Sequence, residues 1–129
     1  MMARQDCALM VAPLLEHPGV SRVVVAHADG VAHFDTASLE EREKGAAAAA
    51  MAAATAAVVG GAMGLEGMQG HVVYAAEKQV VSRPVGSDAI LLVVAEMGPN
   101  GDGVYPLVRR IGRELESGEA PSAVIGDSR

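Results

Sequence analysis

The segment 38–63 constrains the fold more than any other part of the chain. Ten of the twelve residues at 46–57 are alanine, the residue with the highest helix propensity. Ser38 and Glu41 have the spacing of a capping box, and acidic residues fill the first turn, where the helix dipole favours negative charge. A glycine cluster at 60–64 ends the run. The segment therefore predicts one helix roughly 35–40 Å long.

The surface of this predicted helix is apolar and consists of small side chains. Between Gly45 and Leu65 there is no charged residue, and Thr55 carries the single hydroxyl. Because no polar stripe exists, we expect this helix to be covered on more than one side. The protein's own sheet should provide one cover, and a second copy of the same helix should provide the other. The residues we assign to this dimer interface are Ala47, Ala50, Met51, Ala54 and Val58.

A membrane span is the competing interpretation of the same helix. An uncharged stretch of about 20 residues has the length needed to cross a bilayer. Alanine and glycine add little transfer free energy, however. Of the residues that favour insertion most, Leu, Ile and Phe, the stretch contains only Leu65. We therefore expect a soluble helix and no membrane span.

Length and charge restrict the classes of protein that this chain can represent. Its 129 residues match one domain, which we place at 1–116, with a small, polar tail at 117–129 expected to be disordered. The net charge is −6 with ten basic residues, which argues against nucleic-acid binding.

Cysteine usage bears on the compartment. The single cysteine, Cys7, cannot form an internal disulfide, so a reducing compartment is the simplest setting. The apolar run at 8–15 is a poor signal peptide because it is short and Asp6 precedes it. We expect a cytoplasmic protein.

The remaining elements are expected to be short and to alternate in a simple order. Asp29 and Gly30 are expected to form a two-residue type I′ turn between the first two strands. Asp102 should cap the last helix, whose apolar residues recur at helical spacing from Val104 to Leu115. The predicted ranges are helix 2–17, strands 20–28 and 31–35, helix 38–63, strands 68–76, 79–85 and 89–95, and a last helix from 104. This α-ββ-α-βββ-α order predicts an antiparallel sheet, with the long helix on one face and the terminal helices on the other.

No residue pattern forms a catalytic or metal site. His17, His27, His33 and His71 lack metal-ligand spacing, although His27 and His33 can face each other across the first hairpin. Cys7 lies on an apolar helix face, which favours a packed thiol over a nucleophile. We predict a non-enzymatic protein without a cofactor or a metal.

The only basic cluster, Arg109, Arg110 and Arg113, has two interpretations. An arginine supplied to a GTPase can stabilise charge in phosphoryl transfer. Arg110 and Glu114 are an i, i+4 pair, however, which favours an ordinary solvated helix face.

Several strings occur in the order found in a known family. These are PGV at 18–20 leading into VVVAHADG, REKGAAAAAMAA at 42–53, and VVSRPVGSDAILLVV at 80–94. Over about residues 7–116 the chain resembles the roadblock / dynein-light-chain-7 family. The resemblance implies a profilin-like α/β/α sandwich with a five-stranded antiparallel sheet of order 2-1-5-4-3. It also implies a homodimer in which the long helices pack together and the third strands meet at the sheet edge, which adds His71 and Val73 to the interface.

The resemblance leads to two hypotheses of function. The first is a non-enzymatic homodimeric adaptor that binds a small Ras-like GTPase and modulates its nucleotide cycle, because bacterial members act beside such GTPases. Some members are encoded with a sensor-kinase-like ATPase, which would be a further partner. The alternative is a profilin-like small-ligand or haem-binding sensor, with His27, His33 or His71 as ligands.

Overall fold

The structure, a computed structural model, describes residues 2–118. The helices are α1 (Arg4–Glu16), α2 (Leu39–Ala62) and α3 (Val104–Ser117), with a short 3-10 helix, η1 (Pro99–Gly101), before α3. The strands are β1 (Val20–His27), β2 (Ala32–Asp35), β3 (His71–Tyr74), β4 (Lys78–Val85) and β5 (Ala89–Glu96). The predicted order of elements is confirmed. The predicted tail lies outside the described residues except for Ser117 and Gly118, which end α3.

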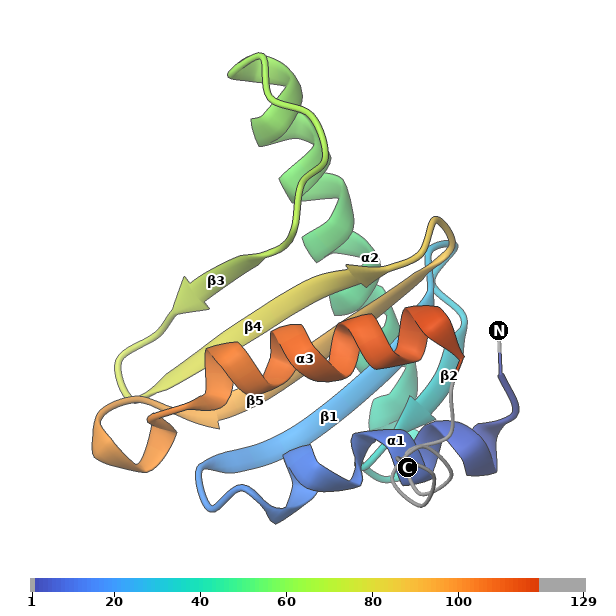
Figure 1. Cartoon of the computed structure of the whole chain (residues 1–129), viewed down its shortest axis with the longest axis vertical. Coiled ribbons are helices and arrows are strands. Elements are labelled where there is room, and N and C mark those ends of the chain that lie inside the picture. Colours follow the sequence, from blue (N-terminus) through green and yellow to red (C-terminus); the bar gives the residue numbers. More distant parts are fainter. Residues whose placement is uncertain (1, 119–129) are drawn as a thin grey trace, which may run out of the picture.

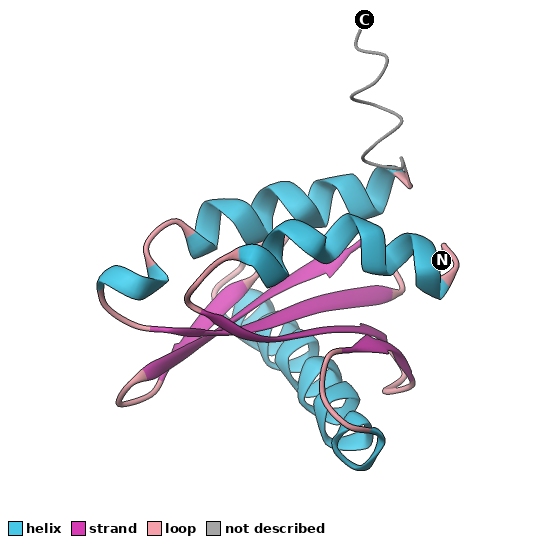
Figure 2. Ribbon diagram, turned by 90° about the horizontal axis from the view of Figure 1, so that it is seen from below, coloured by secondary structure: helices cyan, strands magenta, loops and turns pink. Residues whose placement is uncertain are grey.

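The five strands form one antiparallel sheet in the order β2-β1-β5-β4-β3, as predicted. The helices α1 and α3 lie side by side on one face of this sheet, and α2 lies on the other face (Figure 2). Because β5 is central and both of its faces are covered, its sequence AILLVVAE is almost wholly apolar and buried. The expected α/β/α arrangement is therefore confirmed.

The two faces of the sheet have cores of different kinds. Under α1 and α3 the core is built from branched and long side chains, among them Met10, Leu14, Leu91 and Ile111. Under α2 the core is thin: Ala46 and Ala49 pack on Val24, Leu92 and their neighbours. Small side chains let α2 approach the sheet closely, but they remove little apolar surface from water.

The first half of α2 is anchored to the sheet through a glycine. A Cβ at Gly45 would lie 2.6 Å from Arg22 Nη2 and 2.6 Å from Asp35 Oδ2, so any larger residue would displace these two side chains. Arg22 donates two hydrogen bonds to the Asp35 carboxylate, at 3.0 and 2.8 Å, and a third to the carbonyl of Glu41, at 2.9 Å. The bond to Asp35 raises the pKa of Arg22. This ion pair therefore joins β1, β2 and α2.

The second half of α2 projects beyond the sheet (Figure 1). It is met there by the returning chain, in which Met68 packs so closely on Gly60 that a Cβ would lie 2.8 Å from the Met68 sulfur. The strand predicted at 68–76 spans only His71–Tyr74. Gly67 and Gly70, with φ values of 66° and 136°, delay its start, and a turn in which the Ala75 amide donates to the Lys78 carbonyl ends it.

Two predicted helix starts need correction. Ser38 occupies the N-cap of α2, but its side chain makes no capping hydrogen bond, and the Glu41 carboxylate lies 3.5 Å from Lys44 instead. Asp102 does not cap α3, because the chain turns through Gly103, whose φ is 82°, and that residue is the N-cap.

The first hairpin also differs from its prediction. A type I′ turn needs two residues with positive φ, but only Gly30 has one, at 92°. The Gly30 amide donates to the His27 carbonyl, and the His27 amide donates to the Val31 carbonyl. The loop therefore contains three residues and ends in a left-handed glycine, the next most common hairpin connection.

We predict that Asp35→Ala lowers the free energy of unfolding by about 3 kcal/mol, because it leaves the guanidinium of Arg22 without its buried counter-ion. Urea denaturation at one fixed protein concentration measures the effect. The control is Glu114→Ala, which removes the exposed pair with Arg110 and should cost less than about 1 kcal/mol. Equal effects of the two substitutions would contradict the anchoring role.

Candidate interaction surface on α2 and β3

The outer side of α2 carries most of the residues predicted for the dimer interface. Ala47, Met51, Ala54 and Val58 are four, three and four residues apart, so they share the helix face opposite the buried Ala46 and Ala49. Met51 is 66% exposed and Val58 is 71% exposed. Ala50 is half-buried at the margin of this face. All of them are therefore available to a partner, except that Ala50 is partly covered.

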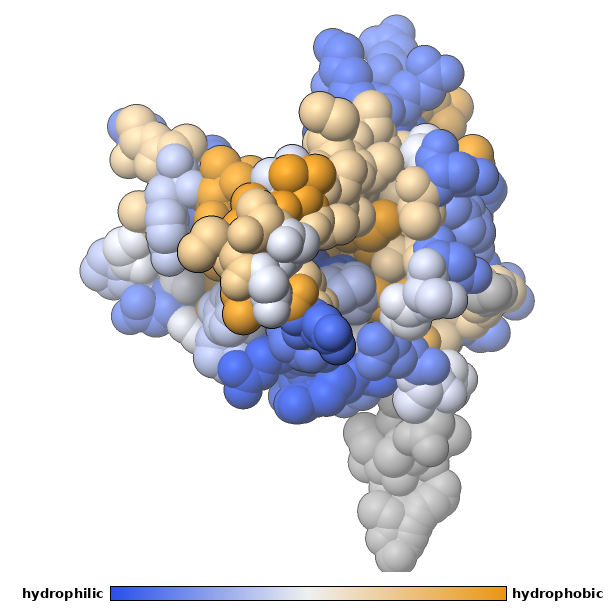
Figure 3. Space-filling model, turned by 90° about the horizontal axis from the view of Figure 1, so that it is seen from above, coloured by the Kyte–Doolittle hydropathy of each residue, from blue (hydrophilic) through white to orange (hydrophobic). Residues whose placement is uncertain are grey.

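Large apolar side chains extend the same surface. Apolar side chains gather in one region of the face seen in Figure 3, bordered by hydrophilic ones. The exposed large apolar residues of α2, the following loop and the α2 side of β3 are Met51, Val58, Val59, Met63, Leu65 and Val73. A contiguous exposed apolar surface of this kind usually marks an interaction site.

Strand β3 forms one edge of the sheet. It pairs only with β4, so the backbone groups on its other side have no partner strand among residues 2–118. The side chains of His71 and Val73 point to the α2 side of the sheet, where Val73 is 54% exposed and His71 is half-buried. An exposed edge invites pairing with another strand.

A groove brings three of the predicted interface residues together. It has a volume of about 300 Å³ and runs between α2 and the strands β3 and β4. Met51, His71 and Val73 all line it, beside Thr55 and Val80. The predicted helix and strand residues, which lie 20 positions apart in the sequence, are therefore neighbours on one surface.

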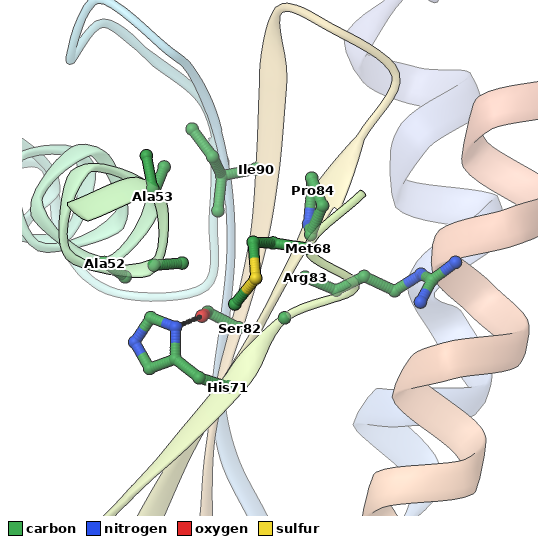
Figure 4. A pocket seen from close by; sticks show the side chains of 11 residues that line it. Ala52, Ala53, Met68, His71, Ser82, Arg83, Pro84 and Ile90 are labelled. Carbon is green, nitrogen blue, oxygen red and sulfur yellow. Dashed lines mark hydrogen bonds between the residues drawn. The ribbon is translucent and has the colours of Figure 1, made fainter. Parts of the chain in front are cut away.

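A smaller cavity opens next to this groove, at the projecting half of α2 (Figure 4). It has a volume of about 150 Å³ and an almost wholly apolar lining that includes Ala53, Met68 and Ile90. His71 Nδ1 lies 3.4 Å from the Ser82 hydroxyl at its wall. Ligand sites in proteins usually have volumes of about 300–1,000 Å³, so this cavity suits one apolar side chain better than a haem.

The four histidines do not converge on one site. The rings of His27 and His33 are perpendicular with centroids 5.3 Å apart, so the predicted approach across the hairpin is observed. His33 also bonds the Met2 carbonyl at 2.8 Å, and burial lowers its pKa. His71 lies on β3, at the opposite edge of the sheet from β2. Within residues 2–118 no group of three potential metal ligands occurs.

Comparison with known proteins addresses the fold. No family model and no curated protein sequence matches the chain. Solved structures do match: MglB of Myxococcus xanthus superposes with a TM-score of 0.76 at 14% identity, over 91% of this chain and 90% of that one. A roadblock/LC7 domain from Streptomyces avermitilis gives a TM-score of 0.72 at 18% identity, over 90% and 95%.

The chain has the roadblock/LC7 fold. A third match, the gliding protein MglB of Thermus thermophilus, agrees with this result at a TM-score of 0.73 and 17% identity, over 91% of each chain. The resemblance inferred from short strings is therefore confirmed at the level of the fold. In this roadblock/LC7 fold the surface described above consists of the long helix and the edge strand.

Some residues of this surface were not anticipated from the sequence. Met68 was placed in a strand, yet it lies on a loop and closes the small cavity against Gly60. Ser82 enters the sequence analysis only as part of the predicted strand 79–85, yet it shares the wall between the groove and the cavity. The signal that could have found Met68 is the pair of glycines around it, Gly67 and Gly70, which disfavour a strand.

Cys7 is a packed thiol, as predicted. It is fully buried on α1 within the larger core, and burial raises its pKa to about 11. At about pH 8 the native thiolate should therefore be roughly two orders of magnitude rarer than in the unfolded chain.

We predict that iodoacetamide labels Cys7 at least 100-fold more slowly in the native protein than in concentrated urea at about pH 8. Mass spectrometry of timed samples measures both rates. Comparable rates in the two conditions would show that the thiol is reactive and exposed.

Proposed function

We propose that this protein is a non-enzymatic, cytoplasmic homodimer that binds a small Ras-like GTPase and regulates its nucleotide cycle. The observation that carries the proposal is the exposed apolar face of α2, which includes Met51 and Val58 and which the rest of the subunit leaves uncovered. Burying such a face stabilises an assembly by roughly 25 cal/mol for each Å² removed from water.

A second copy of the same helix is the cover that fits this face best. The face is built mainly from alanines, so two helices can approach closely and bury backbone as well as side chains. Met51 and Val58 are the large side chains on it, and grooves of the size found beside β3 accept such side chains. The two β3 edges would meet in the same dimer, which removes an exposed edge. One structure with this fold is described as MglB with a tetrameric arrangement, so self-association occurs on the fold.

A bilayer is a less suitable cover for α2, although the helix is long and apolar enough to span one by length and composition. Its first turns carry four charged residues, Glu40, Glu41, Arg42 and Glu43, besides Lys44. The turn that follows is held on the sheet by Gly45, Ala46 and the ion pair of Arg22 with Asp35. Insertion would have to break this packing and expose the thin core of the α2 face.

The role beside a GTPase follows from the resemblance to roadblock proteins. The structural matches to MglB, to MglC of Myxococcus xanthus and to roadblock/LC7 domains support a place among GTPase-associated regulators. A two-helix platform can regulate a GTPase by binding one arrangement of its switch loops more tightly than another. A sensor-kinase-like ATPase would be a further partner of the same system.

The dimer is tested by Ala50→Arg, which places a bulky charge at the margin of the α2 interface. We expect the wild-type protein to have the mass of a dimer and the variant to have the mass of a monomer, because a buried unpaired charge costs several kcal/mol. Light scattering coupled to size exclusion measures both masses. Gln5→Arg, on the exposed part of α1, is the matched control and should remain dimeric. An unchanged mass of the Ala50→Arg variant would contradict the interface.

The partner is tested by calorimetry with a small Ras-like GTPase from the same organism. We expect binding to differ at least fivefold between the GTP-loaded and GDP-loaded forms, because a regulator must distinguish the two states. Absent binding, or equal binding to both forms, would contradict the GTPase role while leaving the dimer intact. The monomeric Ala50→Arg variant should bind more weakly than the Gln5→Arg control.

A further inference from the structure

Arg83 is a buried cation on the face of the sheet opposite α2. It lies on β4 between Val81 and Val85 and is only 7% exposed. Its aliphatic part passes beneath α3 at Gly112, where a Cβ would lie 2.5 Å from the Arg83 Cδ atom. Figure 4 shows that the guanidinium points away from the small cavity and toward α3. Gly112 therefore provides the space through which this side chain reaches the sheet edge.

The guanidinium has no counter-ion within the described part of the chain. No carboxylate of residues 2–118 forms an ion pair with Arg83. Its Nη1 donates only to two neutral oxygens of Gln69, the backbone carbonyl and Oε1, each at 3.3 Å. Its Nε is fully buried without an acceptor. Buried charges in proteins are normally paired, so this arrangement leaves a strong donor unsatisfied.

The flank of α3 above Arg83 is also basic. Val108, Ile111 and Leu115 form the buried side of α3 that faces α1 and the core. At 100° per residue, Tyr105, Arg109 and Arg113 lie on the other side of Gly112, toward the β3 edge. All three are exposed, and Arg109 stands over the Tyr105 ring with its Cζ atom 5.9 Å from the centroid.

One acidic residue, Glu116, also lies on this flank. The Glu116 carboxylate accepts a hydrogen bond from the Gly86 amide at 2.9 Å. Neither Arg109 nor Arg113 forms an ion pair with any described residue. On a chain of net charge −6, this is a local concentration of unpaired positive charge.

We propose that Arg83, with Arg109 and Arg113 above it on α3, forms a docking site for a carboxylate side chain of an acidic protein segment. A carboxylate matches the planar donors of arginine and accepts at about 2.7–2.9 Å, closer than the 3.3 Å bonds to Gln69. In the free protein, the Gln69 side-chain oxygen occupies the position that the carboxylate would take. Its side chain is exposed on the loop between Gly67 and Gly70, so an incoming acidic residue can displace it.

This site lies on the α1 and α3 face of the sheet near the β3 edge, whereas the helix part of the proposed dimer surface lies on the α2 face. Arginine and tyrosine are among the residues that most often dominate binding energy at protein interfaces. The site therefore equips the second face of the sheet to recognise a different, acidic partner.

The experiment is a titration of full-length, ¹⁵N-labelled protein with a hexaglutamate peptide at low salt, followed through the Nε–Hε resonance of Arg83. We expect this resonance to shift and the peptide to bind at least tenfold more tightly than hexaglutamine, with affinity falling as salt is added. Alanine at both Arg109 and Arg113 should weaken binding at least fivefold. Arg110→Ala, which removes the arginine paired with Glu114, is the matched control and should not.

Gln69→Glu provides a second test that does not remove the arginine. The substitution supplies a carboxylate from the protein itself, so it should raise the melting temperature and abolish the response of Arg83 to hexaglutamate. Gln5→Glu adds the same charge on α1 and should do neither. An unmoved Arg83 resonance in the wild-type protein, or a Gln69→Glu variant that still responds, would overturn the proposal. A response to inorganic phosphate at lower concentration than to hexaglutamate would also overturn it, because the site would then select phosphate.

Discussion

Contact between α2 and the sheet at Gly45 determines how the rest of the molecule is arranged. The helix comes close enough there for the Arg22 and Asp35 side chains to fill the space where a Cβ would be. The guanidinium of Arg22, on β1, then binds the Asp35 carboxylate on β2 and the carbonyl of Glu41 on α2. Because this contact fixes α2 by its first half, the second half extends past the sheet (Figure 1), and the outer face of the helix is left uncovered. The exposed surface is thus a consequence of where the helix is held.

The two faces of the sheet show how core composition separates stability from recognition. Under α1 and α3, large side chains interdigitate and supply most of the apolar burial. Under α2, the core is made of alanines and a few strand residues, and the helix buries one narrow stripe. A helix packed so lightly contributes little to the stability of its own subunit. It is correspondingly well suited to share its remaining surface with another molecule.

The sequence was sufficient to predict the order of elements, the antiparallel sheet and the placement of α2 apart from α1 and α3. These depend on strong local signals: an alanine run, a continuously apolar central strand and a regular stripe from Val104 to Leu115. The details that failed depend on backbone geometry at glycines. Gly30 alone has the positive φ that a type I′ turn needs at two positions, and Gly103 takes the cap position assigned to Asp102. Gly67 and Gly70 shorten β3.

The candidate sites were also predictable only as far as local sequence patterns define them. Periodicity places Ala47, Met51, Ala54 and Val58 on one helix face, but only the strand register brings His71 and Val73 beside Met51. Arg83 was overlooked because an arginine in an alternating strand looks like an outward-facing residue. Its burial results from Gly112 on a helix that lies 29 positions later in the sequence.

The projecting half of α2 has a consequence for how folding and assembly are connected. Its last turns are supported within the subunit mainly by Met68 packing on Gly60, and alanine-rich helices without tertiary support are marginal in water. In the proposed dimer, completion of these turns would be linked to association, so protein concentration would influence how much of the helix is formed. The C-terminal turns of α2 would then be more ordered when a second copy is bound, so local structure would depend on the amount of protein present.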